Sequence, residues 1–394
     1  MSLTADVVVI GGGVNGTSTA FHLAQRGVRV TLLERASLAA GSTGKSGALV
    51  RMHYTNPHDA ALAQQSLPYF QGWSDIVGAG DPGFRQVGVV RLVQPRFDEQ
   101  LRANVAMLQG LGVNTDVIAP DDLRAIDPGV QTGDITCAAW EPESGYADPA
   151  ATAYGFAEAA RGLGASIHEG VEATTIKTTG ERVTGVVTPL GRIATDTVVV
   201  APGARADALL APLGLDYGLQ TNRVQIVIMR RTAEDGASHP VYIDGPNKTW
   251  LRPEGDFGTL CGILRDQLGV NPDLYDEGVD FDYIVDSRTR CAARRPALAT
   301  SFMRGGWAGI ITMSPDGHAI IGALAPYQGL FGILGDSGTN FKTAPAIGKC
   351  LAERITEGEA KTVDLHAFRA SRFAEGAFFA GEHEYGDSPL DVFR

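Results

Sequence analysis

The chain has 394 residues, of which 44% are hydrophobic, and its formal net charge at pH 7 is −12. An acidic chain without a basic cluster repels nucleic acid and anionic membranes, which excludes both as partners. No apolar run approaches the roughly 20 residues of a membrane span, and the length suffices for two domains or one domain with a large insertion.

The cysteines and histidines show neither a disulfide framework nor a metal site. The four cysteines lie far apart without a CxxC pair, so we expect free thiols in a reducing compartment. The eight histidines are scattered, and no metal site is predicted. The first predicted strand begins almost at Met1, which leaves no room for a signal peptide, and we expect a cytoplasmic protein.

The first predicted element is a strand over residues 6–10, whose nearly continuous apolar run is typical of a strand buried in a parallel sheet. Gly11 permits the tight turn out of this strand, Gly13 leaves room for a pyrophosphate, and Gly16 lets the next helix pack on the strand. The N-terminus of that helix directs amide groups and a positive dipole at the phosphates.

A second strand is predicted over residues 28–33, and Glu34 stands at its end. A carboxylate at this place accepts hydrogen bonds from a ribose 2′,3′-diol and disfavours a 2′-phosphate. The opening βαβ unit therefore predicts a dinucleotide site, although its fingerprint alone does not separate NAD from FAD.

The later elements change in kind along the chain. Helices are predicted over residues 101–111, 120–126 and 148–163. Short strands are expected over residues 166–169 and 172–177, then a hairpin-like pair over 182–189 and 191–200, with 197–201 a buried strand. Alternating strands over residues 223–229, 241–244, 249–252 and 259–264 indicate a mixed or antiparallel sheet. A strand over residues 329–334 and a helix over 343–356 follow.

The nucleotide-binding pieces thus lie at the start, in the middle and near the end of the chain. We predict a discontinuous cofactor domain over residues 1–80, 145–218 and 325–365. A substrate domain is expected over residues 81–144 and 219–324, and a C-terminal tail over residues 366–394. A simple nicotinamide dehydrogenase usually keeps its Rossmann half contiguous, so this discontinuous layout argues against that class of enzyme.

Four segments occur in the order typical of the D-amino-acid-oxidase-like flavoproteins. They are the Gly11–Glu34 unit, the loop 41–44 (GSTG), the strand and turn 199–204 (VVAPGA), and the segment 335–342 (GDSGTNFK). From about residue 4 to 360 the chain resembles the sarcosine oxidase and glycine oxidase branch of this family. The resemblance implies an α/β (α+β) fold, in which a glutathione-reductase-like Rossmann FAD-binding domain carries an inserted mixed or antiparallel-sheet substrate domain.

The resemblance also implies roles for individual residues. Gly11, Gly13 and Gly16 would meet the pyrophosphate of FAD and Glu34 its ribose. The other implied cofactor contacts are Ser42 and Thr43 (phosphate or ribityl oxygens), Val171 (adenine, through its backbone), Gly203, and, near the pyrimidine end of the isoalloxazine, Gly338, Asn340, Phe341 and Lys342. Arg51 aligns with an arginine that binds the substrate carboxylate, Lys342 aligns with a lysine of that pocket, and Trp250 is a candidate wall. A structural role for Arg51 and a place in the core for Trp250 are the alternatives.

Departures from the family pattern are equally informative. The cysteine that carries covalent flavin in some members corresponds to Gly309, so we expect non-covalent FAD. The lysine that activates oxygen falls close to Cys261, which leaves oxidase and dehydrogenase activity both open. The pocket histidine is not matched, and Arg265 lies nearby in the sequence.

We therefore predict an FAD-dependent enzyme that oxidises the C–N bond of a small glycine-like, N-alkylated or D-amino acid. Hydride transfer to flavin N5 would give an imine that water hydrolyses, with O2 or another electron acceptor. Three alternatives stay open: a 2-hydroxy-acid dehydrogenase, a flavoprotein subunit that needs a partner for electron exit, and an NAD-dependent dehydrogenase. The oligomeric state is not predicted.

Overall fold

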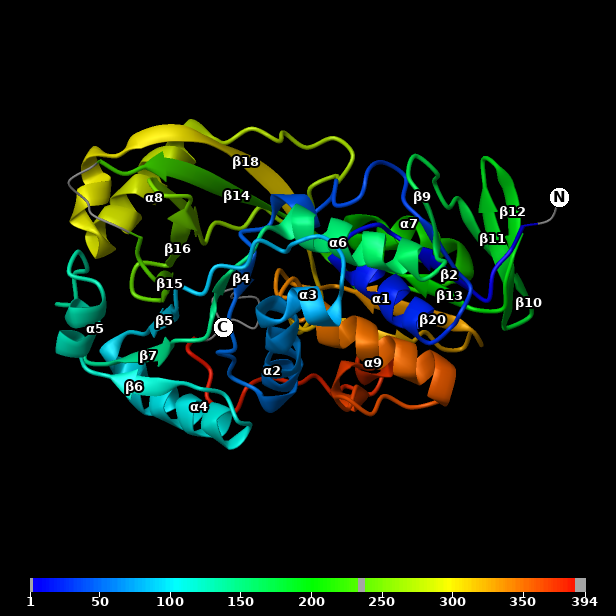
Figure 1. Ribbon diagram of the computed structural model, residues 1–394, viewed down its shortest axis with the longest axis horizontal. Coiled ribbons are helices and arrows are strands. Elements are labelled where there is room, and N and C mark those ends of the chain that lie inside the picture. The colour runs from blue at the N-terminus through cyan, green and yellow to red at the C-terminus, as the bar shows by residue number, and fades with distance from the viewer. Residues whose placement is uncertain (1–2, 233–237, 387–394) are drawn as a thin grey trace.

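The computed structural model describes residues 3–232 and 238–386, and its two large sheets lie side by side (Figure 1). The first is a six-stranded sheet in the order β19-β20-β13-β2-β3-β9. Its strands are β2 (Val7–Ile10), β3 (Val30–Leu33), β9 (Ser166–His168), β13 (Val198–Val200), β19 (Ile320–Ala323) and β20 (Leu330–Leu334). All neighbours are parallel except β19 and β20.

Helices cover one face of this sheet and a smaller sheet covers the other. Helices α1 (Val14–Gln25), α6 (Pro149–Gly162) and α9 (Ala344–Glu357) pack together over the face that carries Val7 and Val9. Over the opposite face lie α7 (Ala206–Leu210) and a four-stranded sheet, β1 (Leu3–Thr4), β12 (Gly191–Ala194), β11 (Arg182–Thr188) and β10 (Thr175–Thr179). Burial on both faces explains the continuous apolar strands.

The second large sheet has eight strands in the order β18-β14-β17-β16-β15-β5-β7-β6. They are β5 (Val89–Leu92), β6 (Asp116–Ile118), β7 (Ala138–Glu141), β14 (Gln220–Arg230), β15 (Val241–Asp244), β16 (Thr249–Glu254), β17 (Gly258–Ile263) and β18 (Phe302–Met313). Only β5 and β15 pair in parallel, and they join strands from two distant stretches of chain. Helix α8 (Phe281–Arg294) packs on one face.

The opposite face of the eight-stranded sheet turns toward the nucleotide half. There Val89, Val241 and Ile243 pack with Leu49 and Trp250. Leu49 belongs to β4 (Leu49–Val50), which pairs with β8 (Gly145–Tyr146). The remaining α-helices of the described residues are α2 (Pro57–Gln71), α3 (Trp73–Ile76), α4 (Asp98–Gly110) and α5 (Pro120–Ile126).

Most predicted elements match the structure, and the differences have physical causes. Residues 191–200 are not one strand, because the chain leaves the small sheet after Ala194 and enters the six-stranded sheet at Val198. Strand β19 lies inside the range predicted for the substrate domain, yet it pairs with β20, so the boundary at residue 325 was wrong by one strand. The predicted tail includes residues 387–394, which lie outside the described residues.

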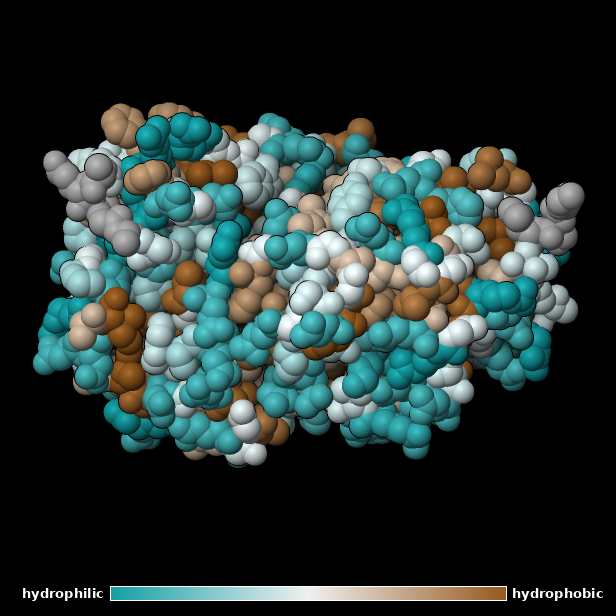
Figure 2. Space-filling model, viewed as in Figure 1, coloured by the Kyte–Doolittle hydropathy of each residue, from teal (hydrophilic) through white to brown (hydrophobic). Residues whose placement is uncertain are grey.

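Figure 2 shows one face of the molecule as mainly hydrophilic, with separate hydrophobic patches. Within the described residues, no helix combines the length and apolar character needed to cross a membrane. The four cysteines are free and buried. The part of the chain that the structure describes contains no group of three or more His, Cys, Asp or Glu side chains that could hold a metal ion.

Candidate active site

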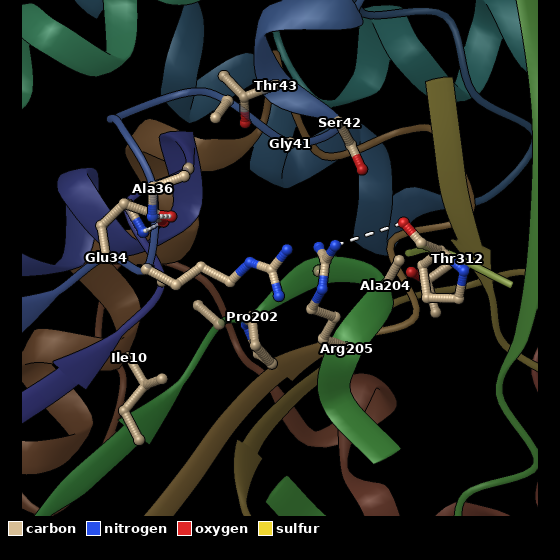
Figure 3. A pocket seen from close by; sticks show the side chains of 18 of the residues that line it. Ile10, Glu34, Ala36, Gly41, Ser42, Thr43, Pro202, Ala204, Arg205 and Thr312 are labelled. Atoms are coloured by element: carbon tan, nitrogen blue, oxygen red, sulfur yellow. Dashed lines mark hydrogen bonds between the residues drawn. The ribbon is translucent and has the colours of Figure 1, made fainter. Parts of the chain in front are cut away.

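A cavity of about 490 Å³ opens at the carboxyl ends of β2, β3 and β13 (Figure 3). Residues Ile10 and Glu34 reach it from the first two strands, and Ala201 and Pro202 from the third. Ile310 and Thr312 of β18 form the opposite wall. Ligands of open α/β sheets bind at this edge, where the strand order reverses.

Two of the predicted glycines are required by close packing. A Cβ atom on Gly11 would lie 2.2 Å from the carbonyl oxygen of Ala201, and its φ of +114° also disfavours other residues. A Cβ atom on Gly16 would lie 2.0 Å from the carbonyl oxygen of Gly11, so glycine lets α1 pack directly on the turn. Gly11 and Gly13 line the cavity, whereas Gly16 lies behind it.

The N-terminus of α1 faces the cavity with most of its amides uncapped. Gly13 is the N-cap and provides no side-chain cap, and the first turn carries no acidic residue. Thr43 Oγ1 accepts the amide hydrogen of Val14 at 3.1 Å. The remaining amides and the helix dipole suit a phosphate group, as the sequence predicts.

Glu34 lies on the cavity wall with its carboxylate held by backbone amides (Figure 3). The amide of Gly12 donates to Oε2 at 2.7 Å, and the amide of Ala36 donates to Oε1 at 2.8 Å. Each carboxylate oxygen keeps further acceptor capacity, which suits the hydroxyl groups of a ribose.

Two arginines that sequence reasoning missed lie at the mouth of the cavity. Arg35 and Arg205 both line it, and both contact Asp273 on the loop between β17 and α8. Arg205 also donates to the carbonyl oxygen of Pro272 at 3.3 Å, and Figure 3 shows its side chain within the cavity. These cations add charge complementarity to a pyrophosphate.

The same loop is held on its other side by Lys45. Lys45 Nζ lies 2.5 Å from both Tyr275 Oη and Glu277 Oε1, and all three residues line the cavity. We define residues 272–277 as the cover loop. The cover loop is more than 200 residues from the glycine turn in the sequence, so no local pattern predicts it. The only signals were two cations that could bind its carboxylates, the lysine of the GSTGK loop and the arginine after β13.

The other predicted cofactor residues divide into two groups. Ser42, Thr43 and Gly203 line the cavity, and Ser42 Oγ donates to the carbonyl oxygen of Ile310 at 2.5 Å. Val171 does not line it: its amide donates to the carbonyl oxygen of Glu34, and the next residues, 172–174, form the wall instead. The backbone contact with adenine expected of Val171 stays a prediction.

The segment 335–342 reaches the cavity only with its first two residues, Gly335 and Asp336. Gly338 is exposed and Asn340 is buried, and neither lines this cavity. Phe341 packs against Phe70 with ring centroids 5.8 Å apart. Of this segment, only Gly335 and Asp336 line the cavity, and the cofactor contacts expected of Gly338, Asn340, Phe341 and Lys342 stay predictions.

Arg51 and Lys342, by contrast, come together as predicted. The Arg51 guanidinium carbon lies 4.6 Å from the centre of the Tyr54 ring, and Lys342 Nζ lies 5.1 Å from it. Both cations are only 6% exposed. Burial, reinforced by the charge of Arg51, holds the pKa of Lys342 well below its ordinary value. Burial raises the pKa of the nearby Glu141, whose Oε1 has no hydrogen-bond partner among the described residues.

Trp250 and Cys261 lie on opposite faces of the eight-stranded sheet. The Trp250 indole fills the space left by two glycines, Gly47 and Gly262, so it packs between the sheet and the chain that leads to Arg51. Cys261 instead points into the core beneath α8, beside Cys291. The resemblance puts the oxygen-activating lysine close to Cys261, give or take a residue, and the neighbouring residue that faces Trp250 is Gly262.

Arg265 and Gly309, the other two positions at which the sequence departs from the family pattern, lie in different places. Arg265 is bound to Asp282 and Asp286 of α8, away from the cavity. At Gly309 a Cβ atom would lie 3.0 Å from Lys45 Cβ, so the position lies directly behind the cavity wall. It offers no thiol for a covalent bond to a cofactor.

Together, the glycine turn, the open helix N-terminus, the Glu34 carboxylate and the two arginines define a fold of the dinucleotide-binding class. Comparison with known families identifies which one. The family described as FAD dependent oxidoreductase matches residues 6–354, and the chain belongs to this family. Its cofactor is FAD, and the NAD alternative is thereby excluded.

Individual relatives agree with this assignment. The chain is 26% identical to sarcosine oxidase subunit beta from Arthrobacter sp over 383 residues, which cover 94% of this chain and 91% of that subunit. It is 27% identical to 4-methylaminobutanoate oxidase (formaldehyde-forming) from Paenarthrobacter nicotinovorans, and 27% identical to mouse mitochondrial dimethylglycine dehydrogenase. The chain spans less than half of these two longer proteins, 45% and 43% of their lengths.

Among solved structures, L-proline dehydrogenase from P. horikoshii superimposes with a TM-score of 0.88 at 27% identity, covering 96% of this chain and 100% of that one. Glycine oxidase from Geobacillus kaustophilus superimposes with a TM-score of 0.82 at 22% identity, covering 94% of this chain and 99% of that one, which supports the fold alone. The predicted resemblance to the D-amino-acid-oxidase-like flavoproteins is confirmed.

Proposed function

We propose that the protein oxidises the C–N bond of a small amino acid, N-alkylated or otherwise glycine-like, to an imine that water then hydrolyses. The observation that carries this proposal is the pair of buried cations, Arg51 and Lys342, on the Tyr54 ring. The names of the relatives support it, since sarcosine, dimethylglycine and 4-methylaminobutanoate each combine a carboxylate with an N-alkylated amine.

Arg51 would bind the substrate carboxylate. A guanidinium presents parallel N–H donors that match both carboxylate oxygens, and burial strengthens the charge-assisted hydrogen bonds. One of its nitrogens already donates to the carbonyl oxygen of His53, which fixes the direction of the group. Lys342 would add a second donor to the same anion, since its Nζ is anchored at 2.9 Å to the carbonyl oxygen of Thr339.

A carboxylate between these groups would also relieve an electrostatic cost. Two buried cations repel each other, and this repulsion contributes to the lowered pKa of Lys342. An incoming anion favours the protonated lysine again. A site built on these two groups would therefore favour substrates that carry a negative charge over simple amines.

The cofactor would be held without a covalent bond. Gly11, Gly13 and the α1 N-terminus would meet the pyrophosphate and Glu34 the ribose, with Ser42, Thr43 and Gly203 along the cavity wall. When bound, FAD supplies the two-electron acceptor that an amine oxidation requires. The contribution of the chain is to bind the carboxylate, orient the amine and exclude water.

The direct test is anaerobic reduction of the yellow holoenzyme by a panel of amino acids, N-methyl amino acids, simple amines and 2-hydroxy acids. We expect bleaching of the flavin band by N-alkylated or glycine-like amino acids and none by simple amines. Bleaching by 2-hydroxy acids alone would replace the proposal with the hydroxy-acid alternative. An Arg51→Ala variant is expected to keep FAD and to need at least tenfold more substrate.

A second candidate is a flavoprotein subunit that passes its electrons to a partner. The specific observation is that Gly262, not a cation, faces Trp250 at the place where the resemblance puts an oxygen-activating lysine. One relative is named as the beta subunit of sarcosine oxidase. Slow reoxidation of the reduced protein by air, with fast reoxidation by an artificial acceptor, would favour this candidate over an oxidase.

A further inference from the structure

The C-terminal segment 379–385 contacts the stretch of chain that carries Arg51. In Figure 1 this red segment leaves the region beneath α9 and runs toward α4. On α4, Asn104 Nδ2 donates to the carbonyl oxygen of His383 at 2.8 Å. At the other end, the Phe379 ring stacks on His318 with centroids 4.0 Å apart. The segment is thus held on both sides of the Arg51 stretch.

Tyr385 makes the central contact of this segment. Its Oη lies 2.7 Å from His53 Nε2, and the two rings are stacked at 5.8 Å. The guanidinium carbon of Arg91, on β5, lies 4.7 Å from the centre of the Tyr385 ring. Tyr385 therefore fills the space between the eight-stranded sheet and the stretch that follows β4.

His53 is coupled directly to Arg51. The carbonyl oxygen of His53 accepts a hydrogen bond from Arg51 Nη1. Its side chain is only 1% exposed, and Nε2 has Tyr385 as its partner while Nδ1 has none among the described residues. The carbonyl group that orients the guanidinium belongs to the backbone that carries this ring, so the contact with Tyr385 helps to hold that backbone in place.

Both members of the His53–Tyr385 pair are uncharged at neutral pH. Burial, together with the charges of Arg91 and Arg51, holds the pKa of His53 well below its ordinary value. Burial raises the pKa of Tyr385 to about 12. Their contact is a neutral hydrogen bond, which positions groups without adding charge beside the proposed carboxylate site.

A second contact holds the other side of Tyr54. Thr55 Oγ1 donates to Glu384 Oε1 at 2.9 Å, and the same oxygen accepts the amide hydrogen of Gly381 at 2.6 Å. A Cβ atom on Gly381 would lie 2.4 Å from Thr55 Oγ1, so glycine is needed for this approach. The C-terminal segment therefore fixes both neighbours of the tyrosine on which Arg51 and Lys342 lie.

We propose that Tyr385 is a positioning residue for the carboxylate site: through its hydrogen bond to His53 it holds the Arg51 guanidinium in the direction that binds the substrate. This inference rests on the proposed function, because Arg51 is the group through which Tyr385 acts. It gives the C-terminal segment a part in substrate affinity, beyond its part in packing.

The experiment measures acetate binding to the holoenzyme through the change that it causes in flavin absorbance. Loss of one neutral hydrogen bond corresponds to about a three- to tenfold change in affinity. Tyr385→Phe keeps the ring and its stacking, so we expect the acetate Kd and the substrate KM to rise by about this factor, with kcat and FAD content unchanged. The matched control is Tyr327→Phe, which removes a hydroxyl that donates to the Leu213 carbonyl oxygen at 2.7 Å, remote from Arg51.

A double-mutant cycle tests whether the effect passes through His53. If it does, Tyr385→Phe in a His53→Gln background lowers acetate affinity no further than His53→Gln alone. Additive losses would overturn the proposed route. Wild-type acetate affinity in a folded, FAD-loaded Tyr385→Phe protein would overturn the proposal, as would loss of FAD in step with loss of acetate binding, since that marks a role in the fold.

Failure of the proposed function gives a different result. In that case acetate leaves the wild-type flavin spectrum unchanged, and Arg51→Ala has no effect on any substrate. Failure of the present inference alone leaves a wild-type response to acetate that depends on Arg51 and not on Tyr385.

Discussion

Asp59 Oδ2 and His318 Nδ1 lie 2.7 Å apart and join two parts of the chain that are 259 residues distant. Asp59 is on α2, and His318 precedes β19, so the pair connects α2 with the edge of the six-stranded sheet. Both side chains are buried, and the charge of Asp59 also acts on Lys342. This pair thus links the fold to the proposed carboxylate site through the charge of Asp59.

Asp59→Asn is expected to lower the free energy of unfolding by about 3 kcal/mol, because it leaves one partner of a buried pair uncompensated. Burial raises the pKa of Asp59, but the charge and hydrogen bond of His318 outweigh it, and the pKa is lowered. Because the pKa is lower in the folded state, the ionised carboxylate stabilises the fold at pH values above the pKa of the unfolded chain, about 3.9. This stabilisation is lost as the pH falls below that value. Urea titrations at pH 3 and pH 7 check this: a variant as stable as wild type at pH 7 would contradict it.

Gly16→Ala and Gly162→Ala form a matched pair of helical substitutions. At Gly16 the added Cβ would lie 2.0 Å from the Gly11 carbonyl oxygen, whereas at Gly162 it meets nothing within 4 Å. We expect Gly16→Ala to lose FAD and melt at a lower temperature. Gly162→Ala should raise the free energy of unfolding by about 0.5–1 kcal/mol, from helix propensity alone. Retention of FAD by the Gly16 variant would remove the close-packing argument.

Lys342→Met is expected to raise stability while weakening substrate binding. Burial and the charge of Arg51 lower the pKa of this lysine, so the unfolded chain binds its proton more tightly. Lys342 therefore lowers the stability of the fold at neutral pH, and this cost disappears as the pH rises past about 10.4, the pKa of a lysine in the unfolded chain. Thermal melts at pH 7 and pH 10.5 should show a stabilisation by the variant at the lower pH only. The exposed Lys361→Met serves as the control.

Asp273→Asn tests the cover loop. Asp273 pairs with Arg205 and Arg35, and the substitution removes the charge that holds residues 272–277 over the cavity. Since these side chains are partly exposed, the substitution should weaken the attachment of the loop by only about 0–1 kcal/mol. We expect FAD to dissociate about two- to fivefold faster, as followed by flavin fluorescence. Asp6→Asn, which breaks an exposed pair with Arg29 away from the cavity, should leave the rate unchanged.

The sequence predicted the parts of the site that are made by neighbouring residues. The β2–α1–β3 unit could be recognised because the glycine turn and Glu34 both lie within the first 34 residues of the chain, and their spacing reflects one local geometry. The pairing of Arg51 with Lys342 came from resemblance, since no local pattern joins residues so distant.

The parts that were missed depend on long-range packing. Arg205 and the cover loop meet across 67 residues of intervening chain, and no periodicity in the sequence encodes that approach. An alignment that places the lysine position within one residue of Cys261 cannot choose its face, because a shift of one residue along a strand reverses the side-chain direction. Tyr385 lies in a stretch with no regular element, where propensity gives no information.

The parallel pairing of β5 with β15 has a consequence for how the chain is made. It joins Val89–Leu92 to Val241–Asp244, and the six-stranded sheet likewise lacks β20 until residue 334 has been synthesised. Neither sheet can close while the nascent chain is short, and contacts between distant residues form slowly. The early strands therefore keep exposed edges until then, and we expect neither sheet to close before its late strands, β15 and β20, have been synthesised.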